Sequence, residues 1–403
     1  MNFNRFIPLS NLKNLKSVTK KNLQKFISKT IENLKNKNHL LNSLNKDYKL
    51  NFNFSELKKY KKFKRIIILG MGGSILGTEA IGQFLTHKIK KKIIFLNNLD
   101  EDLINKINKT KDLKNSLFLI ISKSGNTVEV LSIIDSIKNK ANFNNRNTLI
   151  ITENNNNDLS FFAQNNKIKI IFHKKHIGGR YSVFSETGLV PCYLMGINIS
   201  KFKKNTLDFL RKDKNILIKN LINMSKIYSS KKINSLILLN YCSGLDTFLL
   251  WCQQLIAESL GKKGRGLIPI ISKGPRDHHS LLQLFLDGPQ DKFFYLFSIK
   301  EKNKIKNSGK LFKRSLNKSN SYKVIQEQKN AFLTILKNKN IPHLSIEIKK
   351  RDEATLGKLF SYFIFETIFL GEDLKINPFN QPAVEQVKII TKKNLFKGSK
   401  HNL

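Results

Sequence analysis

The sequence is poor in cysteine, tryptophan, proline and acidic residues. Its three cysteines, Cys192, Cys242 and Cys252, form no CxxC pair, so we expect neither a disulfide framework nor a thiolate metal site. No run approaches the ~18 consecutive apolar residues of a membrane-spanning helix, and no apolar segment has the pattern of a secretion signal. We therefore expect a soluble cytoplasmic protein that has no membrane partner.

The positive charge of the chain comes from lysine. Against 29 Asp and Glu there are 63 Lys and 9 Arg, which gives a net charge of +43, and there are 47 Asn as well. Nucleic-acid recognition favours clustered arginine, because the planar guanidinium binds phosphates and bases through two hydrogen bonds. Lys, Asn, Ile and Phe share A/T-rich codons, so genome composition accounts for the pattern. We expect no specific nucleic-acid partner; the alternatives are weak adhesion to polyanions and steering of a small anionic substrate.

Short apolar runs typical of buried strands alternate along the chain with helical patterns. The expected strands cover 65–69, 93–96, 117–121, 148–152, 168–172, 236–240, 267–271, 293–299 and 344–348. The clearest helices cover 75–85, 246–260, 321–339, 353–369 and 377–393. This order predicts an α/β protein with two three-layer α/β/α domains and mainly parallel sheets. We place a helical arm at 1–60, the first domain at 61–200, the second at 201–372 and a C-terminal helical tail at 373–403.

Two loops follow expected strands, at the end of the sheet where open α/β proteins bind ligands. Ser122-Lys-Ser-Gly-Asn-Thr127 brings three hydroxyls and a glycine to the start of a helix. Such a loop suits a phosphate dianion, or it is a plain helix cap. Gly70-Met-Gly-Gly-Ser74 lets the backbone approach a ligand closely, but it is not GxGxxG and does not predict a dinucleotide.

Three further positions could take part in acid–base chemistry. Arg180, in a loop of small residues, either faces an oxyanion or solvates a turn. Glu258 ends an apolar helix and is either a desolvated base or a capping surface residue. His278 and His279 are adjacent and have no partner at zinc-ligand spacing, so acid–base work is the better functional interpretation and no metal is expected.

Taken together and in this order, six segments resemble the glucose-6-phosphate isomerase (phosphoglucose isomerase) family. The resemblance covers about residues 65–390. The segments are LGMGGSILG (69–77), ISKSGNTVE (121–129), GGRYSVFSETGLVP (178–191), WCQQLIAESLGK (251–262), DHHSLLQLFLDGP (277–289) and NPFNQPAVEQVK (377–388). The resemblance implies two sugar-isomerase (SIS) domains. It also implies an enzyme of glycolysis and gluconeogenesis that interconverts glucose 6-phosphate and fructose 6-phosphate without cofactor or metal.

The resemblance also implies a role for each matching residue. Glu258 would move the proton between C1 and C2, and Arg180 would stabilise the enediolate. The sugar ring would be opened by His279 and Lys388. The phosphate would be bound by Ser122, Ser124, Thr127 and the backbone of Lys123. The sugar would be held by Gly73, Ser74, Gln254 and Gln381. The family forms homodimers, so the site would include the partner subunit's His279.

Two positions depart from the family pattern. Asn126 stands near a position where Thr is usual, so one phosphate contact is expected to differ. His278 stands where Gln is usual and would perturb the pKa of His279. Three other functions stay open: an isomerase that also accepts mannose 6-phosphate, a non-catalytic sugar-phosphate-binding module, and a nucleic-acid binder. Intact Glu258, Arg180 and Lys388 argue against the non-catalytic module.

Overall fold

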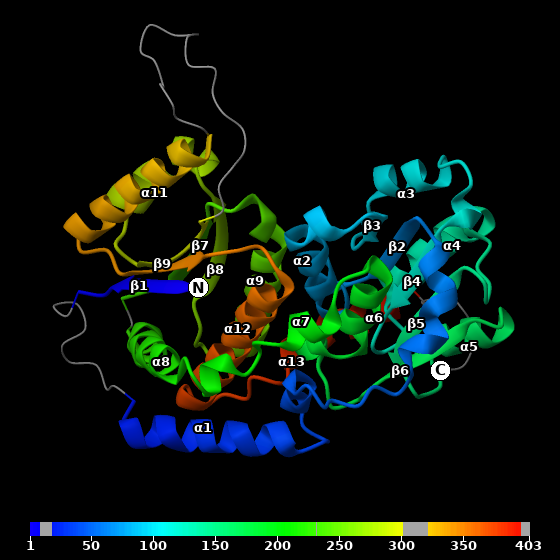
Figure 1. Cartoon of the computed structure of the whole chain (residues 1–403), viewed down its shortest axis with the longest axis horizontal. Coiled ribbons are helices and arrows are strands. Elements are labelled where there is room, and N and C mark those ends of the chain that lie inside the picture. The colour runs from blue at the N-terminus through cyan, green and yellow to red at the C-terminus, as the bar shows by residue number, and fades with distance from the viewer. Residues whose placement is uncertain (9–17, 231, 301–320, 396–403) are drawn as a thin grey trace, which may run out of the picture.

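Two five-stranded sheets form the framework of the protein (Figure 1). The computed structural model describes residues 1–8, 18–230, 232–300 and 321–395. The first sheet has the order β3-β2-β4-β5-β6, and all its neighbouring strands are parallel. Its strands are β2 (Arg65–Gly70), β3 (Lys92–Leu96), β4 (Leu117–Ile121), β5 (Thr148–Glu153) and β6 (Lys169–His173). These strands match the predicted ones within a residue or two.

The second sheet has the order β1-β10-β9-β7-β8 and is parallel except at one edge. Its strands are β1 (Asn2–Phe6), β7 (Ser235–Asn240), β8 (Ile268–Lys273), β9 (Lys292–Ile299) and β10 (His343–Ile348). Strand β1 pairs with β10 in the antiparallel direction. The predicted α/β class with mainly parallel sheets is therefore confirmed, whereas the domain boundaries stay a prediction.

The N-terminal segment differs from the expected helical arm. Residues 2–6 are a strand, so the helical prediction is wrong there, although helix α1 (Lys20–Lys35) does lie within the arm. The ring of Phe3 packs against Phe209 and Tyr362, with centroids 5.8 and 5.1 Å apart. These partners lie about 200 or more positions away along the chain, so the local sequence pattern could not reveal the strand.

Helices cover both sheets (Figure 1). The longer ones after α1 are α2 (Leu76–Phe84), α3 (Glu101–Asn108), α4 (Val128–Ala141), α5 (Asp158–Asn165), α6 (Glu186–Met195), α8 (Lys214–Ser229), α9 (Asp246–Leu260), α11 (Ser321–Asn338), α12 (Glu353–Asp373) and α13 (Pro382–Leu395). Helix α2 follows the first sheet's β2 and packs against α9, which follows β7 of the second sheet. The loops that precede α2 are thereby brought beside α9.

Helix α12 is long and apolar enough to cross a membrane by length and composition. In the fold, however, 83% of its most apolar window is buried inside the protein. Its aromatic rings pack against those of neighbouring elements. The ring centroid of Phe360 lies 4.6 Å from that of Trp251, and the ring centroid of Phe363 lies 5.7 Å from that of Tyr295. Helix α12 is therefore a core helix of the second sheet.

A buried carboxyl group lies within this core. Glu366 of α12 accepts hydrogen bonds from the hydroxyls of Tyr295 and Tyr362, both at 2.7 Å. Burial raises its pKa to about 7, although the two hydroxyls favour the charged form. Above the usual pKa of 4.5, the unfolded chain loses this proton while the folded chain keeps it. The contribution of Glu366 to stability is thus fully present below pH 4.5 and is lost as the pH rises through 7.

We expect Glu366→Gln to remove this pH dependence. Between acid pH and pH 8, the native protein should lose roughly 3 kcal/mol of unfolding free energy that the variant does not lose. Urea unfolding at both pH values measures the difference. Glu327→Gln, on the exposed face of α11, is the matched control and should show no such change. An equal response of both variants would contradict the role given to Glu366.

Candidate active site

The first sheet places two glycine- and serine-rich loops side by side. From β2 the chain crosses outward to β3 and then returns to β4 on the other side of β2. The carboxyl ends of β2 and β4 therefore flank a topological switch point, the usual binding crevice of an open α/β sheet. Gly70–Ser74 follows β2 and Ser122–Thr127 follows β4. The tertiary fold thus joins two motifs that lie about 50 residues apart.

The loop Ser122–Thr127 gathers its hydroxyls at the start of α4. The Oγ of Ser122 lies 2.8 Å from Thr127 Oγ1, and the Oγ of Ser124 lies 3.4 Å from the same atom. Thr127 occupies the N-cap position, yet its side chain makes no capping hydrogen bond. A plain helix cap would use that hydroxyl. The arrangement instead directs three hydroxyls toward one point beside the first N–H groups of a 14-residue helix, a geometry suited to a phosphate.

The backbone of this loop is held from behind. Gly125 has φ = +70°, and a Cβ there would lie 1.9 Å from Asn157 Oδ1, so a larger residue does not fit. The side chain of Asn126 accepts a hydrogen bond from the backbone N–H of Asp158 at 2.8 Å. Asn126, the first departure from the family pattern, therefore ties the loop to α5. The ammonium of Lys123 donates to Lys175 O at 2.9 Å and lies 3.4 Å from Glu153 Oε1, whereas the predicted phosphate contact of Lys123 is through its backbone.

We expect loss of either inner hydroxyl to weaken phosphate binding. Ser122→Ala and Thr127→Val each remove a donor to a charged acceptor, which costs roughly 1.5–3 kcal/mol. Titration with substrate and with inorganic phosphate should show the same loss of affinity, because both ligands present the same dianion. Ser132→Ala, on the outer face of α4, is the control. Unchanged affinities in both loop variants, with the fold intact by circular dichroism, would refute the assignment.

Arg180 is the centre of a second group of polar side chains. It lies in the helical turn η7 (Gly179–Phe184) after β6 and is 3% exposed. Its Nη1 donates to Glu258 Oε2 at 3.1 Å and to Gln381 Oε1 at 2.6 Å. Its Nε donates to Ser259 Oγ at 2.8 Å, and its Nη2 to Pro378 O at 2.7 Å. One guanidinium thus joins η7, the end of α9 and the segment before α13.

Helix α9 and the glycine loop complete this group. Gln254, one turn before Glu258, donates from Nε2 to Glu258 Oε1 at 2.9 Å, while its own Oε1 is buried without a partner. The indole N–H of Trp251 donates to Arg180 O at 3.0 Å. A Cβ on Gly73 would lie 2.4 Å from Arg180 N, so only glycine permits this approach. Five predicted site residues are therefore neighbours: Gly73, Arg180, Gln254, Glu258 and Gln381.

Three residues of this group were not predicted as site residues. Ser259 and Tyr181 follow Glu258 and Arg180 directly, and the Tyr181 hydroxyl bonds to both Ser259 Oγ and Pro378 O at 3.0 Å. Lys262 donates to Asn377 O at 2.5 Å, and burial, together with the charge of Arg180, lowers its pKa to about 8. All three lie within the recognised motifs. Their place within these motifs could have marked them as site residues, but nothing in the sequence indicated which groups they contact.

The structure leaves two predicted catalytic residues outside this group. Lys388 is exposed on α13 and pairs with Glu385 at 2.8 Å. His279 is exposed after β8, at the end of the turn η10 (Arg276–His279). The neighbouring His278 bonds through Nε2 to the Tyr241 hydroxyl at 2.6 Å, and burial, followed by the charge of His279, lowers its pKa. The roles of Lys388 and His279 stay predictions. Helix α13 begins at Pro382, so the predicted helix starts five residues too early.

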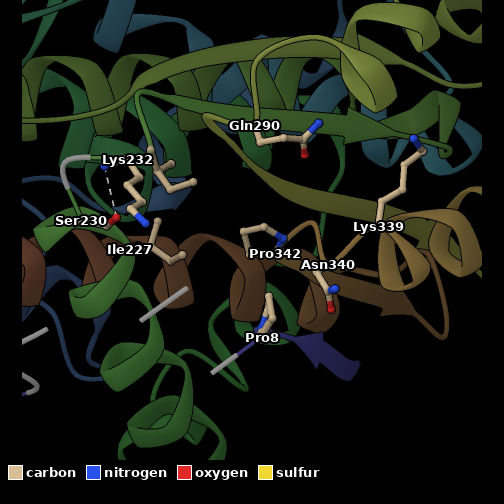
Figure 2. Close-up of a pocket in the computed structure, with 9 residues that line it drawn as sticks. Pro8, Ile227, Ser230, Lys232, Gln290, Lys339, Asn340 and Pro342 are labelled. Carbon is tan, nitrogen blue, oxygen red and sulfur yellow. Dashed lines mark hydrogen bonds between the residues drawn. The ribbon is translucent and has the colours of Figure 1, made fainter. Parts of the chain in front are cut away.

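Two other observations bear on what the chain binds. Among the described residues, no group of three or more His, Cys, Asp or Glu side chains could hold a metal ion. A cavity of about 370 Å³ lies near the amino ends of β7, β9 and β10, where Lys232, Gln290 and Pro342 line it (Figure 2). It contains none of the predicted site residues and lies at the edge opposite the crevice where α/β sheets bind ligands.

The two mainly parallel sheets, the hydroxyl loop and the contact of buried Arg180 with Glu258 define a class, the α/β sugar-phosphate isomerases. The sequence profile described as Phosphoglucose isomerase matches residues 32–266. The chain is 33% identical to the glucose-6-phosphate isomerase of Methanocaldococcus jannaschii, over 84% of this chain and 86% of that protein. The enzyme of the same name from Campylobacter jejuni is also 33% identical, with the same coverage. The chain belongs to the phosphoglucose isomerase family.

Solved structures bear out the fold. A hypothetical protein from Thermus thermophilus superimposes with a TM-score of 0.79 at 22% identity, covering 93% of this chain and 94% of that one. A glucose-6-phosphate isomerase from Chlamydia trachomatis gives a TM-score of 0.73 at 18% identity, covering 94% of this chain and 75% of that one. The two-sheet architecture is therefore shared at low sequence identity.

Proposed function

We propose that this chain interconverts glucose 6-phosphate and fructose 6-phosphate through a cis-enediolate, an enzyme activity of glycolysis and gluconeogenesis. Membership of the phosphoglucose isomerase family supports the reaction. The observation that carries the proposal is the contact between buried Arg180 and the Glu258 carboxylate at 3.1 Å. A carboxylate base beside a fixed cation is what proton transfer next to a carbonyl requires.

Glu258 is the proposed base. Arg180 holds its Oε2 and Gln254 holds its Oε1, so the carboxylate has a fixed orientation. Its side chain is 24% exposed and can therefore reach a ligand. In the open-chain aldose, Glu258 would take the proton from C2, the electron pair would form the C1–C2 double bond, and the carbonyl oxygen would become the enediolate oxygen. Transfer of the proton of the C2 hydroxyl to O1 and return of the first proton to C1 then give the ketose, with its carbonyl group at C2.

Arg180 is the proposed stabiliser of the enediolate. Its guanidinium is always charged and its orientation is fixed by Ser259 and Pro378, so little reorganisation is needed when negative charge develops. The buried, unpartnered Oε1 of Gln254 is available to a sugar hydroxyl. The hydroxyl loop would hold the phosphate, which takes no part in the reaction and whose binding energy orients the reacting carbons. Ring opening by His279 and Lys388 belongs to the same proposal.

A coupled assay for fructose 6-phosphate isomerisation in the presence of EDTA tests this function. We expect full activity, because every proposed role belongs to the protein's own side chains or backbone. Loss of turnover in EDTA that zinc restores would contradict the mechanism. Mannose 6-phosphate, assayed in parallel, separates a dedicated enzyme from one with dual specificity. Absence of turnover with either sugar would leave a sugar-phosphate-binding module.

We further propose a cytoplasmic homodimer whose sites include His279 of the partner subunit. Helix α13 presents an exposed apolar surface that includes Val387 (67% exposed) and, one turn later, Ile390 (59%), which supports contact with a second copy. His279 is exposed and is free to reach a neighbouring chain. The three cysteines are buried and form no disulfide with one another, which supports a reducing compartment.

We expect two inactive variants to restore activity when they are mixed. His279→Ala and Glu258→Gln each disable every site of a homodimer, but a mixed dimer contains one site with both native groups. The measurement is turnover after subunit exchange, with exchange itself followed by a fluorescence label. The control is His87→Ala, which should stay active alone. Exchange without any recovered turnover would mean that His279 acts within its own chain.

A further inference from the structure

A basic hollow of about 610 Å³ lies at the amino edge of the first sheet. Three segments line it: 62–65, which leads into β2, 112–115, which precedes β4, and 142–147, which precedes β5. The hydroxyl loop and Arg180 follow the carboxyl ends of the strands, at the opposite edge of the same sheet. The basic hollow is therefore separate from the candidate active site, and an inference about it does not rest on the proposed isomerase activity.

The charge around the basic hollow exceeds what the composition of the chain explains. Of its eleven lining residues five are basic, against 72 of 403 in the whole chain. Two of the nine arginines of the protein are among these five, which matters because biased codon usage accounts for the lysines. Asp112 is the single acidic lining residue, and within the described part of the chain none of the five forms an ion pair. The five basic residues are Lys62, Lys64, Arg65, Lys114 and Arg146.

The wall of the basic hollow is rigid. Asn147 is 3% exposed; its amide donates to Ala141 O at 3.1 Å, and its Oδ1 accepts from the N–H of Asn144 at 3.0 Å. The Oδ1 of Asn144 accepts from the backbone N–H of Arg146 at 2.9 Å, which fixes the loop that carries this arginine. Arg65 donates from Nη1 to Ser116 Oγ at 3.2 Å, while its buried Nε has no partner. The loop backbone and the guanidinium of Arg65 are thus held in place before any ligand binds.

We propose that the basic hollow binds a small ligand that carries two or more phosphate groups. Five cations against one carboxylate leave a local charge of about +4, more than a single phosphate dianion neutralises. Like charges held together without counter-charges repel one another, and a polyvalent anion relieves this repulsion. The guanidinium groups of Arg65 and Arg146 can each bind a phosphate through two hydrogen bonds, which favours phosphate over neutral ligands.

Calorimetric titration of the full-length protein with tripolyphosphate tests this assignment. The variant Lys114→Gln/Arg146→Gln removes two cations at exposed positions, so the change should leave the fold intact. We expect it to bind tripolyphosphate at least about tenfold more weakly at about 50 mM salt. Lys21→Gln/Lys25→Gln lowers the net charge equally on exposed positions of α1 and should stay within about twofold of the native affinity. Equal losses in both variants would reduce the effect to net charge and overturn the proposal.

Two further arms separate the basic hollow from other anion sites. Thr127→Val should leave tripolyphosphate binding unchanged; a parallel loss would place this ligand in the hydroxyl loop and overturn the proposal. A short single-stranded RNA is titrated in the same way. If Lys114→Gln/Arg146→Gln weakened RNA binding but not tripolyphosphate binding, the basic hollow would be a nucleic-acid surface and the small-ligand proposal would fail. Failure of the native protein to bind tripolyphosphate would also overturn it.

Discussion

Replacing Glu258 by glutamine should lower kcat by at least ~10²–10⁴-fold while substrate still binds. Glutamine keeps the shape of the side chain and one oxygen that can accept from Arg180, but it cannot accept a proton. The native carboxylate accepts a hydrogen bond at each oxygen, so its position in the site is fixed. The loss should therefore appear in turnover and not in affinity.

Exchange of the C2 hydrogen of the substrate with deuterated solvent provides a second measurement. Isomerisation and exchange need the same base, so both should fall in parallel in Glu258→Gln. Glu32→Gln, on the exposed face of α1, has the same chemical change away from the site and should match the native enzyme. Near-normal exchange in Glu258→Gln would mean that another residue is the base, with Lys388 the next candidate.

Replacing Arg180 by lysine should lower kcat by roughly 10²–10³-fold, the usual effect of losing a fixed donor to a developing oxyanion. Lysine keeps the positive charge. It loses the planar fork that contacts Glu258, Gln381, Ser259 and Pro378 at the same time. The positive charge would then remain but would not be held in a fixed position, and the segment 377–381 would lose its hydrogen bonds to residue 180.

The affinity for inorganic phosphate distinguishes a catalytic role of Arg180 from a general structural one. The hydroxyl loop follows β4 and is held by Asn157 and Asp158, so Arg180→Lys should leave phosphate binding intact. Arg211→Lys, at an exposed position, is the matched control. A kcat within about threefold of native would show that the guanidinium does not stabilise the enediolate, and an equal loss of phosphate affinity would indicate a damaged fold.

The helices and strands were largely predictable because their signals are local. A run such as Ile66–Leu69 is apolar on both faces, as a strand covered by helices on each side must be. The hydroxyls of Ser122 and Thr127 and the glycines of the first loop were also visible as motifs. Their position at a strand end followed from the order of the elements, without any knowledge of which strands pair.

The contacts between motifs could not be predicted in the same way. Arg180 and Gln381 are 201 positions apart, and only the packed fold shows that they share a hydrogen bond. The same holds for the contacts of Ser259, Tyr181 and Lys262, to which the sequence motifs assigned no function. Strand β1 was missed because what stabilises it is pairing with β10, about 340 residues later.

The sequence by itself determined the α/β class, the parallel strands and the identity of the loops that end them. It did so because hydrophobic period and turn chemistry are properties of a few neighbouring residues. Only the tertiary structure decided which side chains meet. The packing of α2 against α9 brings Gly73, Arg180 and Glu258 together, and the amino edge of the first sheet gathers five basic residues from three segments. The burial of a side chain and its distance from other side chains depend on the packing of the whole chain, so a single motif cannot predict them.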